Sequence, residues 1–247
     1  MIPGFWSSAQ TTLPEPIAAA FLLGGIMLAA RSRWLSASGA FAASLLTRET
    51  GVVAVGCFLA AEAVRHKRRE AWWAGVLAVS VVVAWRCYVA WVLYPDRGLR
   101  GLLFHPPDLG LPWQGVADLW RRVAAGQYYP TVPEMSRAAI TYPVLLTYGF
   151  GLAIALMVTR PHAWHAAAVT YGLVAVSLNL PAIWIHVVNA QRGTFELFVM
   201  LALATTEIRR CGPRLQSLCF GFWVLSGVYV FLLGYNAGYI RDVLTFI

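Results

Sequence analysis

Charged side chains are scarce in this chain, and acidic side chains are the scarcest. Only 12% of its 247 residues are charged, with 11 Asp and Glu against 19 Lys and Arg, whereas 59% are hydrophobic. A single water-soluble core of this length cannot bury so much apolar surface. The composition therefore excludes a soluble globular protein and predicts a chain embedded in a membrane.

Cysteine motifs and a signal peptide are also absent. The 4 cysteines include no CxxC pair and no metal-ligand spacing, so they are predicted to be packing residues. The start, Met1–Trp6, has no basic residue and no small-residue cleavage site, which excludes a secretory signal peptide. Nothing in it directs the first apolar run to insert with its N-terminus outside. Either the short uncharged tail is translocated by itself, or, as we expect, a membrane segment precedes Met1.

Basic residues gather in short clusters that separate long apolar runs. The clusters are Arg31 with Arg33; Arg65, Lys67, Arg68 and Arg69; Arg160 with His162 and His165; and Arg209, Arg210 and Arg214. They occupy every second connection, which is the positive-inside pattern of a multi-span membrane protein and places these connections in the cytoplasm. Because topology accounts for most of the net charge of +8, the sequence predicts no nucleic-acid partner.

The apolar runs predict an all-α fold, a polytopic transmembrane helical bundle of about eight spans. The expected spans cover residues 13–30, 34–46, 50–64, 71–93, 138–158, 163–188, 193–206 and 217–240. We expect residues 1–247 to form a single transmembrane domain in the lipid bilayer, with both termini external. Four segments then face outward together: the start through Glu15, Thr47–Thr50, residues 94–137 and Asn189–Arg192.

The external stretch of residues 94–137 contains an amphipathic segment. Its apolar residues recur at spacings of three or four and are Trp113, Val116, Leu119, Trp120 and Val123. This period predicts a short helix in the membrane interface. The helix serves either as a lid over a lipid-linked substrate or as an anchor to the membrane surface.

Arg48 and Glu49 are adjacent charges between two apolar runs, with no polar linker around them. A charge near the bilayer centre costs about 2.5 to 3.5 kcal/mol, so each needs a partner or water. Adjacent helical side chains point about 100° apart, so at least one of the two is expected to address another helix or a polar cavity. Two interpretations are open: a structural ion pair, or an anion site in which the Arg48 fork binds phosphate. Arg86, about 10 Å from the outer end of its span, either snorkels outward or joins this site.

Further polar residues lie at the outer ends of the expected spans. Glu15, between two prolines, either stabilises the N-terminus of the first span or contributes to substrate binding. Arg192 and Glu196 are four residues apart and can pair along one helix face. The neighbouring Gln191 adds hydrogen-bonding capacity of the kind that binds a sugar or a diphosphate.

Three stretches carry a resemblance to a known family. They are Leu13–Pro16 leading into an Ala/Leu span, Ser44–Gly51, and the basic turn Arg65–Arg69 with the Trp-bearing span that ends at Trp91. Together they resemble the middle region of bacterial GT-C-type membrane glycosyltransferases, most clearly over residues 13–98. The resemblance implies an enzyme of the bacterial cytoplasmic membrane that takes a sugar from a polyprenyl-phosphate donor at the extracytoplasmic face. It transfers that sugar to a lipid, glycan or protein acceptor.

The implied reaction needs a base for the acceptor hydroxyl and cationic groups for the departing phosphate, often with a divalent cation, Mg²⁺ or Mn²⁺. The nearby carboxylates for the base or the cation are Glu15 and Glu49. The phosphate side is expected to consist of Arg48, Arg86, Gln191 and Arg192.

The chain departs from that family in one respect. Its members place their catalytic acidic residue in the first external loop, behind a first span, and no carboxylate of this chain corresponds to it. Enzymatic activity itself is therefore a prediction, and two other classes stay open: a multi-span transporter or lipid flippase, and a non-catalytic membrane subunit. No repeat relates the first four spans to the last four, which disfavours a transporter built from inverted repeats.

Overall fold

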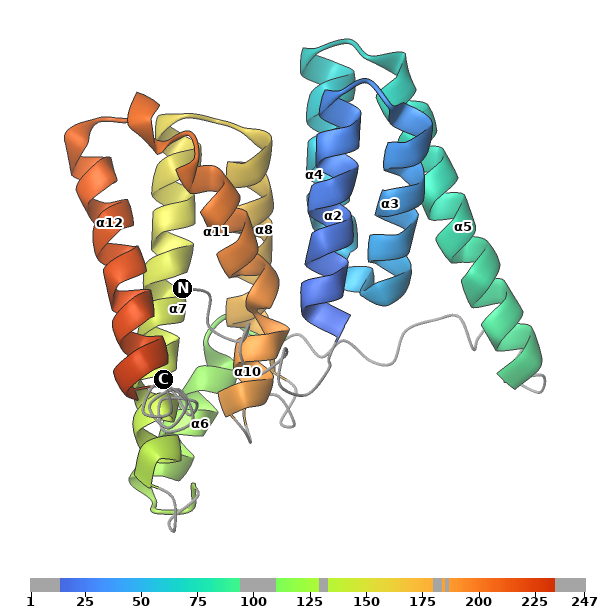
Figure 1. Ribbon diagram of the computed structural model, residues 1–247. Coiled ribbons are helices and arrows are strands. Elements are labelled where there is room, and N and C mark those ends of the chain that lie inside the picture. Colours follow the sequence, from blue (N-terminus) through green and yellow to red (C-terminus); the bar gives the residue numbers. More distant parts are fainter. Residues whose placement is uncertain (1–13, 94–109, 129–132, 180–183, 185–186, 234–247) are drawn as a thin grey trace, which may run out of the picture. The chain divides into compact units, whose positions relative to one another are not determined.

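The computed structural model describes residues 14–93, 110–128, 133–179, 184 and 187–233, and every regular element among them is helical (Figure 1). This confirms the all-α prediction. The chain divides into two compact units. Residues 14–93 lie in one, called here the four-helix unit, and residues 110–233 lie in the other, called the second unit.

The four-helix unit consists of antiparallel neighbours joined by short turns (Figure 1). Its helices are α2 (Pro14–Ala30), α3 (Trp34–Thr47), α4 (Val52–Arg65) and α5 (Arg69–Leu93). A single 3-10 turn, η1 (Glu49–Gly51), joins α3 to α4. These bounds agree within a few residues with the first four apolar runs of the sequence.

Close approach of α2 and α3 depends on a glycine. The Phe41 side chain of α3 is fully buried, and a Cβ atom built on Gly25 of α2 lies 2.5 Å from its ring. Phe41 also packs against Phe58 of α4, with ring centroids 5.9 Å apart. The absence of a side chain at Gly25 therefore lets one aromatic ring join three helices.

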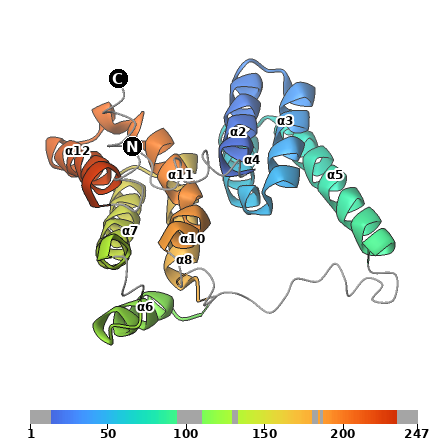
Figure 2. The same ribbon diagram turned by 60° about the horizontal axis from the view of Figure 1, so that its bottom comes forward.

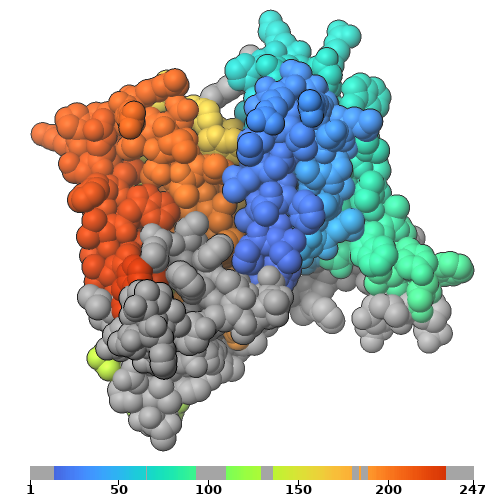
Figure 3. Space-filling view, viewed as in Figure 1, coloured from blue at the N-terminus to red at the C-terminus, as the bar shows by residue number. Residues whose placement is uncertain are grey.

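Both basic turns of the four-helix unit lie at the same end (Figure 1). The guanidinium of Arg68, before α5, lies 5.9 Å from the Trp34 ring centre, at the start of α3. Arg68 also pairs with Glu62 at 3.5 Å. Side chains of the α4–α5 turn project from this end in the space-filling view (Figure 3). The two connections that the sequence assigns to the cytoplasm are thus brought together in space.

The second unit packs its helices around buried aromatic rings. Its elements are α6 (Gln114–Ala124), α7 (Pro133–Thr159), α8 (Ala163–Ser177), α10 (Val187–Gly193), α11 (Phe195–Thr205), η3 (Ile208–Arg210), α12 (Pro213–Val228) and a π-helical turn, η4 (Tyr229–Leu233). Tyr142, Phe198 and Phe222 are fully buried, and their rings form a stack with centroids 5.8 to 6.2 Å apart. This aromatic core holds α7, α11 and α12 together.

The basic connections of the second unit also share one end, where α7 and α11 finish and α8 and α12 begin (Figure 1). One member of these clusters is not a surface charge. His165 is fully buried, and its Nδ1 atom lies 2.6 Å from the carbonyl oxygen of Arg160. The imidazole therefore stabilises the α7–α8 turn by donating to a free carbonyl at the end of α7.

The amphipathic helix expected inside the long external stretch is confirmed as α6, which lies across the opposite end of this unit (Figure 2). It buries Val116 and Leu119 and exposes Trp120. Trp113, just before the helix, anchors it: its backbone N–H donates to the Val176 carbonyl at 2.6 Å. Residues 94–109 and 129–132 of that stretch lie outside the described residues.

Two expected boundaries in the second unit are wrong. The run 163–188 is not one helix, because α8 ends at Ser177 and the chain is not helical at the next two residues. There the Val176 and Ser177 carbonyls accept from the backbone N–H groups of Trp113 and Gly110 at 2.6 and 2.7 Å, and the Trp184 indole donates to the Leu178 carbonyl at 2.7 Å. Asn189–Arg192, expected to be a connection, lies inside helix α10. The hydrophobicity of a segment predicts that the segment is buried, but it does not predict the contacts with other segments that interrupt a helix.

Within the part of the chain that the structure describes, three helices are long and apolar enough to cross a membrane: Arg69–Val92, Ser136–Thr159 and Pro213–Phe231. Four further apolar helices among the described residues are shorter, and they are α2, α3, α8 and α11. The long helices indicate a membrane protein, as the composition predicts.

Candidate functional site

A buried ion pair of the four-helix unit joins Glu15 to Arg48. The Glu15 carboxylate lies in the first turn of α2 and is only 3% exposed, and its Oε1 atom is 2.8 Å from a guanidinium nitrogen of Arg48. Arg48 is 16% exposed. The expectation that Glu15 stands at a helix N-terminus is confirmed, and the contact adds a tie from α2 to the α3–α4 junction.

Backbone geometry at Arg48 explains how it reaches α2. The residue is extended, with φ −152° and ψ 111°, and it ends α3 while its N–H still bonds the Ser44 carbonyl at 2.8 Å. Its Nε atom donates to the Thr50 hydroxyl at 3.0 Å. Below it, the Ser44 hydroxyl donates to the Ala18 carbonyl at 2.9 Å, a second polar tie between α2 and α3.

Glu49 points to a different helix from Arg48. Its carboxylate forms an ion pair with Arg86 of α5, and both side chains are 51% exposed. The expectation that at least one of the two adjacent charges addresses another helix is therefore confirmed, and both do so. Arg86 joins this junction, which was one of its two expected roles. Two neighbouring residues thus connect the α3–α4 junction to α2 on one side and to α5 on the other.

These charges lie at one end of the four-helix unit, where α2 begins and α3 meets α4, and the basic turns lie at the other (Figure 1). Arg48 and Arg86, two of the three arginines expected to bind phosphate, each already have a carboxylate partner. The arrangement can act as a structural clamp. It can also present a guanidinium to an anion, because arginine has five N–H donors and a carboxylate engages only some of them.

Gln191 belongs to a buried hydrogen-bond network of the second unit. It is 3% exposed, and its Nε2 atom donates to the Tyr229 hydroxyl at 2.5 Å. Beside it, the hydroxyls of Tyr142 and Thr194 are hydrogen-bonded to each other. Ring centroids of Tyr142 and Tyr229 lie 5.5 Å apart. The network ties α10 to α7 and to the end of α12, so Gln191 is a packing residue in this structure as well as a candidate ligand.

Arg192 and Glu196 are both half-buried at the same end of the second unit, and each interacts with at least one other group. Arg192 follows Gln191 on α10, so its orientation depends on the network that holds that helix. Whether Arg192 approaches the Arg48 junction stays a prediction, because the two residues belong to different units.

The described residues do not form a metal centre: no group of three or more His, Cys, Asp or Glu side chains comes together among them. Glu15 and Glu49, the carboxylates expected to bind Mg²⁺ or Mn²⁺, both face an arginine. A guanidinium at such a distance competes electrostatically with a bound cation. The geometry at these residues does not fit the expected divalent cation.

Sequence reasoning missed several hydrogen-bonding side chains inside apolar segments. They are Ser44, Tyr142, Thr194 and Tyr229. Each is a polar residue within an apolar segment, and the prediction for that segment used only its hydrophobicity. The available signal was the cost of burying a hydroxyl in an apolar environment, which requires a hydrogen-bond partner.

Comparison of the chain with protein-family models, with curated proteins and with solved structures finds no significant match. The resemblance to GT-C-type glycosyltransferases therefore rests on the short motifs of residues 13–98.

Proposed function

We propose that this chain is a multi-span protein of a bacterial cytoplasmic membrane that binds a polyprenyl-phosphate-linked sugar at its extracytoplasmic face and transfers the sugar. In this arrangement α2, α3, α4, α5, α7, α8, α10 with α11, and α12 provide about eight crossings. The stretch 94–137 with α6 is then external.

One observation supports the proposal most directly: within the four-helix unit, the Glu15–Arg48 and Glu49–Arg86 pairs lie at the end opposite the basic turns. If basic turns are retained in the cytoplasm, the paired charges face outward. Buried charge is costly in a membrane protein and is generally associated with a functional site.

The two pairs suit different roles in this proposal. Glu15 is almost fully buried, so it positions the Arg48 guanidinium instead of meeting substrate. The positioned guanidinium of Arg48 binds the departing phosphate. Glu49 is half exposed, so it is the carboxylate that an acceptor hydroxyl can reach and the candidate base. Arg86 lies beside that carboxylate and adds positive charge for the phosphate.

The test measures binding of a polyprenyl monophosphate to the full chain in lipid nanodiscs. Arg48→Gln removes the cation, and Glu15→Gln with Arg48→Gln removes the pair without leaving a buried carboxylate unpaired. We expect both proteins to lose at least about tenfold in affinity, since a charge-assisted phosphate contact is lost. Arg68→Gln, which breaks a pair at the opposite end of the same unit, is the matched control and should bind normally.

A non-catalytic membrane subunit is the second candidate, favoured by the carboxylate partners of Arg48 and Arg86. In that case both pairs only tie helices together. The double variant then retains lipid binding equal to that of the unaltered protein, which contradicts the phosphate site.

Sidedness is tested separately. In a chain whose 4 native cysteines are replaced by alanine, a cysteine at Glu49 should react with a membrane-impermeant maleimide added outside intact cells. A cysteine at Ser36, near the basic end, should react only after permeabilisation. The reverse pattern would remove the extracytoplasmic site.

A further inference from the structure

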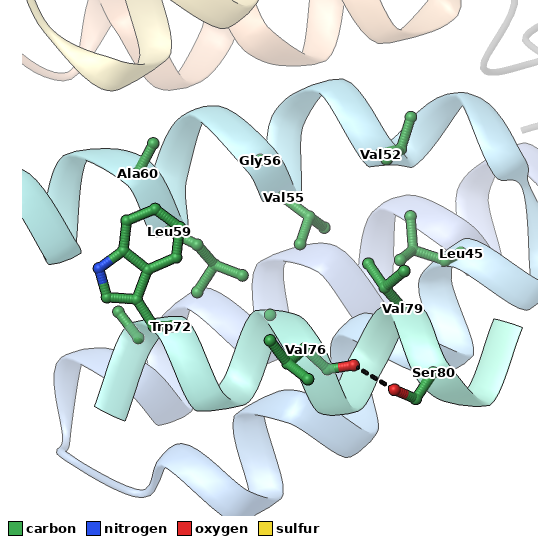
Figure 4. A pocket seen from close by; sticks show the side chains of 12 residues that line it. Leu45, Val52, Val55, Gly56, Leu59, Ala60, Trp72, Val76, Val79 and Ser80 are labelled. Carbon is green, nitrogen blue, oxygen red and sulfur yellow. Dashed lines mark hydrogen bonds between the residues drawn. The ribbon is translucent and has the colours of Figure 1, made fainter. Parts of the chain in front are cut away.

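An apolar groove of about 410 Å³ runs between α4 and α5 (Figure 4). Small residues open it, with Gly56 and Ala60 on α4 and Gly75 on α5. Figure 4 shows Trp72 beside Ala60 at one end and Val79 near Val52 at the other. The lining is mostly hydrocarbon: its one hydroxyl, on Ser80, donates to the Val76 carbonyl at 2.8 Å, and the Trp72 indole N–H is the other side-chain donor.

The Trp72 end of the groove meets the basic turn. Arg69 precedes Trp72 by three residues and therefore lies on the same face of α5. Arg69 and Lys67 are exposed, and neither forms an ion pair with another described residue. Glu62, by contrast, is engaged by His66 and Arg68. With Glu70 as the only other acidic residue between positions 62 and 70, this end of the groove carries a net positive charge.

The opposite end differs in charge. There Glu49 and Arg86 neutralise each other. An anionic amphiphile in the groove therefore meets a net positive charge only at the Lys67–Arg69 end. That end carries an exposed tryptophan, Trp72, which is typical of the membrane–water interface.

We propose that this groove binds one anionic phospholipid of the bilayer, with an acyl chain between α4 and α5 and its phosphate on Lys67 and Arg69. The length of the groove suits an acyl chain, because its α4 wall, from Val52 to Ala60, is about 12 Å long at 1.5 Å per residue. Clusters of Lys and Arg at the cytoplasmic surface attract anionic head groups. The site is independent of the sugar transfer proposed above and lies at the other end of the same unit.

The experiment is native mass spectrometry of the full chain in detergent, titrated with phosphatidylglycerol, phosphatidylcholine or a polyprenyl monophosphate. Gly56→Leu fills the groove, because a Cβ at Gly56 meets no atom within 4 Å and the larger side chain enters open space. Gly39→Leu is the matched control, since a Cβ at that exposed α3 glycine also meets nothing within 4 Å and Gly39 does not line the groove. Ala60→Leu fills the same groove if Gly56→Leu does not fold.

We expect the unaltered chain to bind phosphatidylglycerol at least about fivefold more tightly than phosphatidylcholine, since only the former has a net negative head group. Gly56→Leu should weaken the binding of phosphatidylglycerol by about tenfold or more, because the acyl chain loses its apolar contacts with the groove. Gly39→Leu should leave this affinity unchanged. Lys67→Gln with Arg69→Gln should abolish the preference between the two phospholipids. Equal affinities for the two phospholipids, equal behaviour of Gly56→Leu and Gly39→Leu, or tighter groove-dependent binding of the polyprenyl monophosphate would each overturn the proposal.

Discussion

The Glu15–Arg48 pair offers the sharpest test of how the four-helix unit is held together. Arg48→Gln leaves the Glu15 carboxylate charged at 3% exposure without its guanidinium. Breaking a buried pair from one side costs about 3 to 5 kcal/mol, since the remaining charge stays desolvated. Glu15→Gln leaves Arg48, which is 16% exposed and still donates to Thr50, so its cost is smaller, about 1 to 3 kcal/mol.

Changing both residues to glutamine should alter the free energy of unfolding by no more than about 1 kcal/mol, because no uncompensated charge is left. The double-mutant cycle then yields a coupling energy above about 3 kcal/mol. The measurement is reversible unfolding of the purified protein in mixed micelles, followed by circular dichroism. Arg68→Gln is the control, since its partner Glu62 is 19% exposed and Arg68 itself 40%. Loss of that exposed pair and of the cation–π contact costs about 1 to 2 kcal/mol.

The reasoning fails if Arg48→Gln is no more destabilising than Arg68→Gln, or if the double variant is as unstable as Arg48→Gln alone. The first result would show that Glu15 is hydrated in the folded protein. The second would show that the arginine stabilises the fold through contacts other than Glu15.

Two further predictions concern packing. Gly25→Ala should be about 1 to 3 kcal/mol less stable than Gly24→Ala in the same unfolding assay, because a Cβ at Gly25 meets the Phe41 ring at 2.5 Å and one at Gly24 meets nothing within 4 Å. Both variants gain the same helix propensity of about 1 kcal/mol. Equal stabilities would therefore contradict the tight α2–α3 contact. Tyr229→Phe should cost about 1 to 3 kcal/mol by leaving the buried Gln191 amide without its acceptor. Adding Gln191→Leu should restore most of that loss in the same assay, and a further loss instead would show that the amide has other essential partners.

Periodicity and composition predicted the helices well where local sequence controls them. The α2–α3 and α4–α5 turns follow from long apolar runs that end at clusters of arginine, which cannot remain in hydrocarbon. The short helix α6 was predicted from its amphipathic spacing alone, because that period is a local property of the chain. The same approach failed at Ser177, where α8 ends although the apolar run continues.

Residue identity alone also established that Arg48 and Glu49 need partners, since charge in an apolar segment is costly whatever the fold. Only the tertiary structure decided who those partners are: Glu15 lies 33 positions from Arg48 along the chain, and Arg86 lies 37 positions from Glu49. It also decided that Gln191 faces Tyr229 in the interior and that a groove opens beside Gly56. The physical reason is that hydrophobicity and charge are properties of each residue, whereas pairing depends on how helices approach, and that approach is set by side chains from several elements at once.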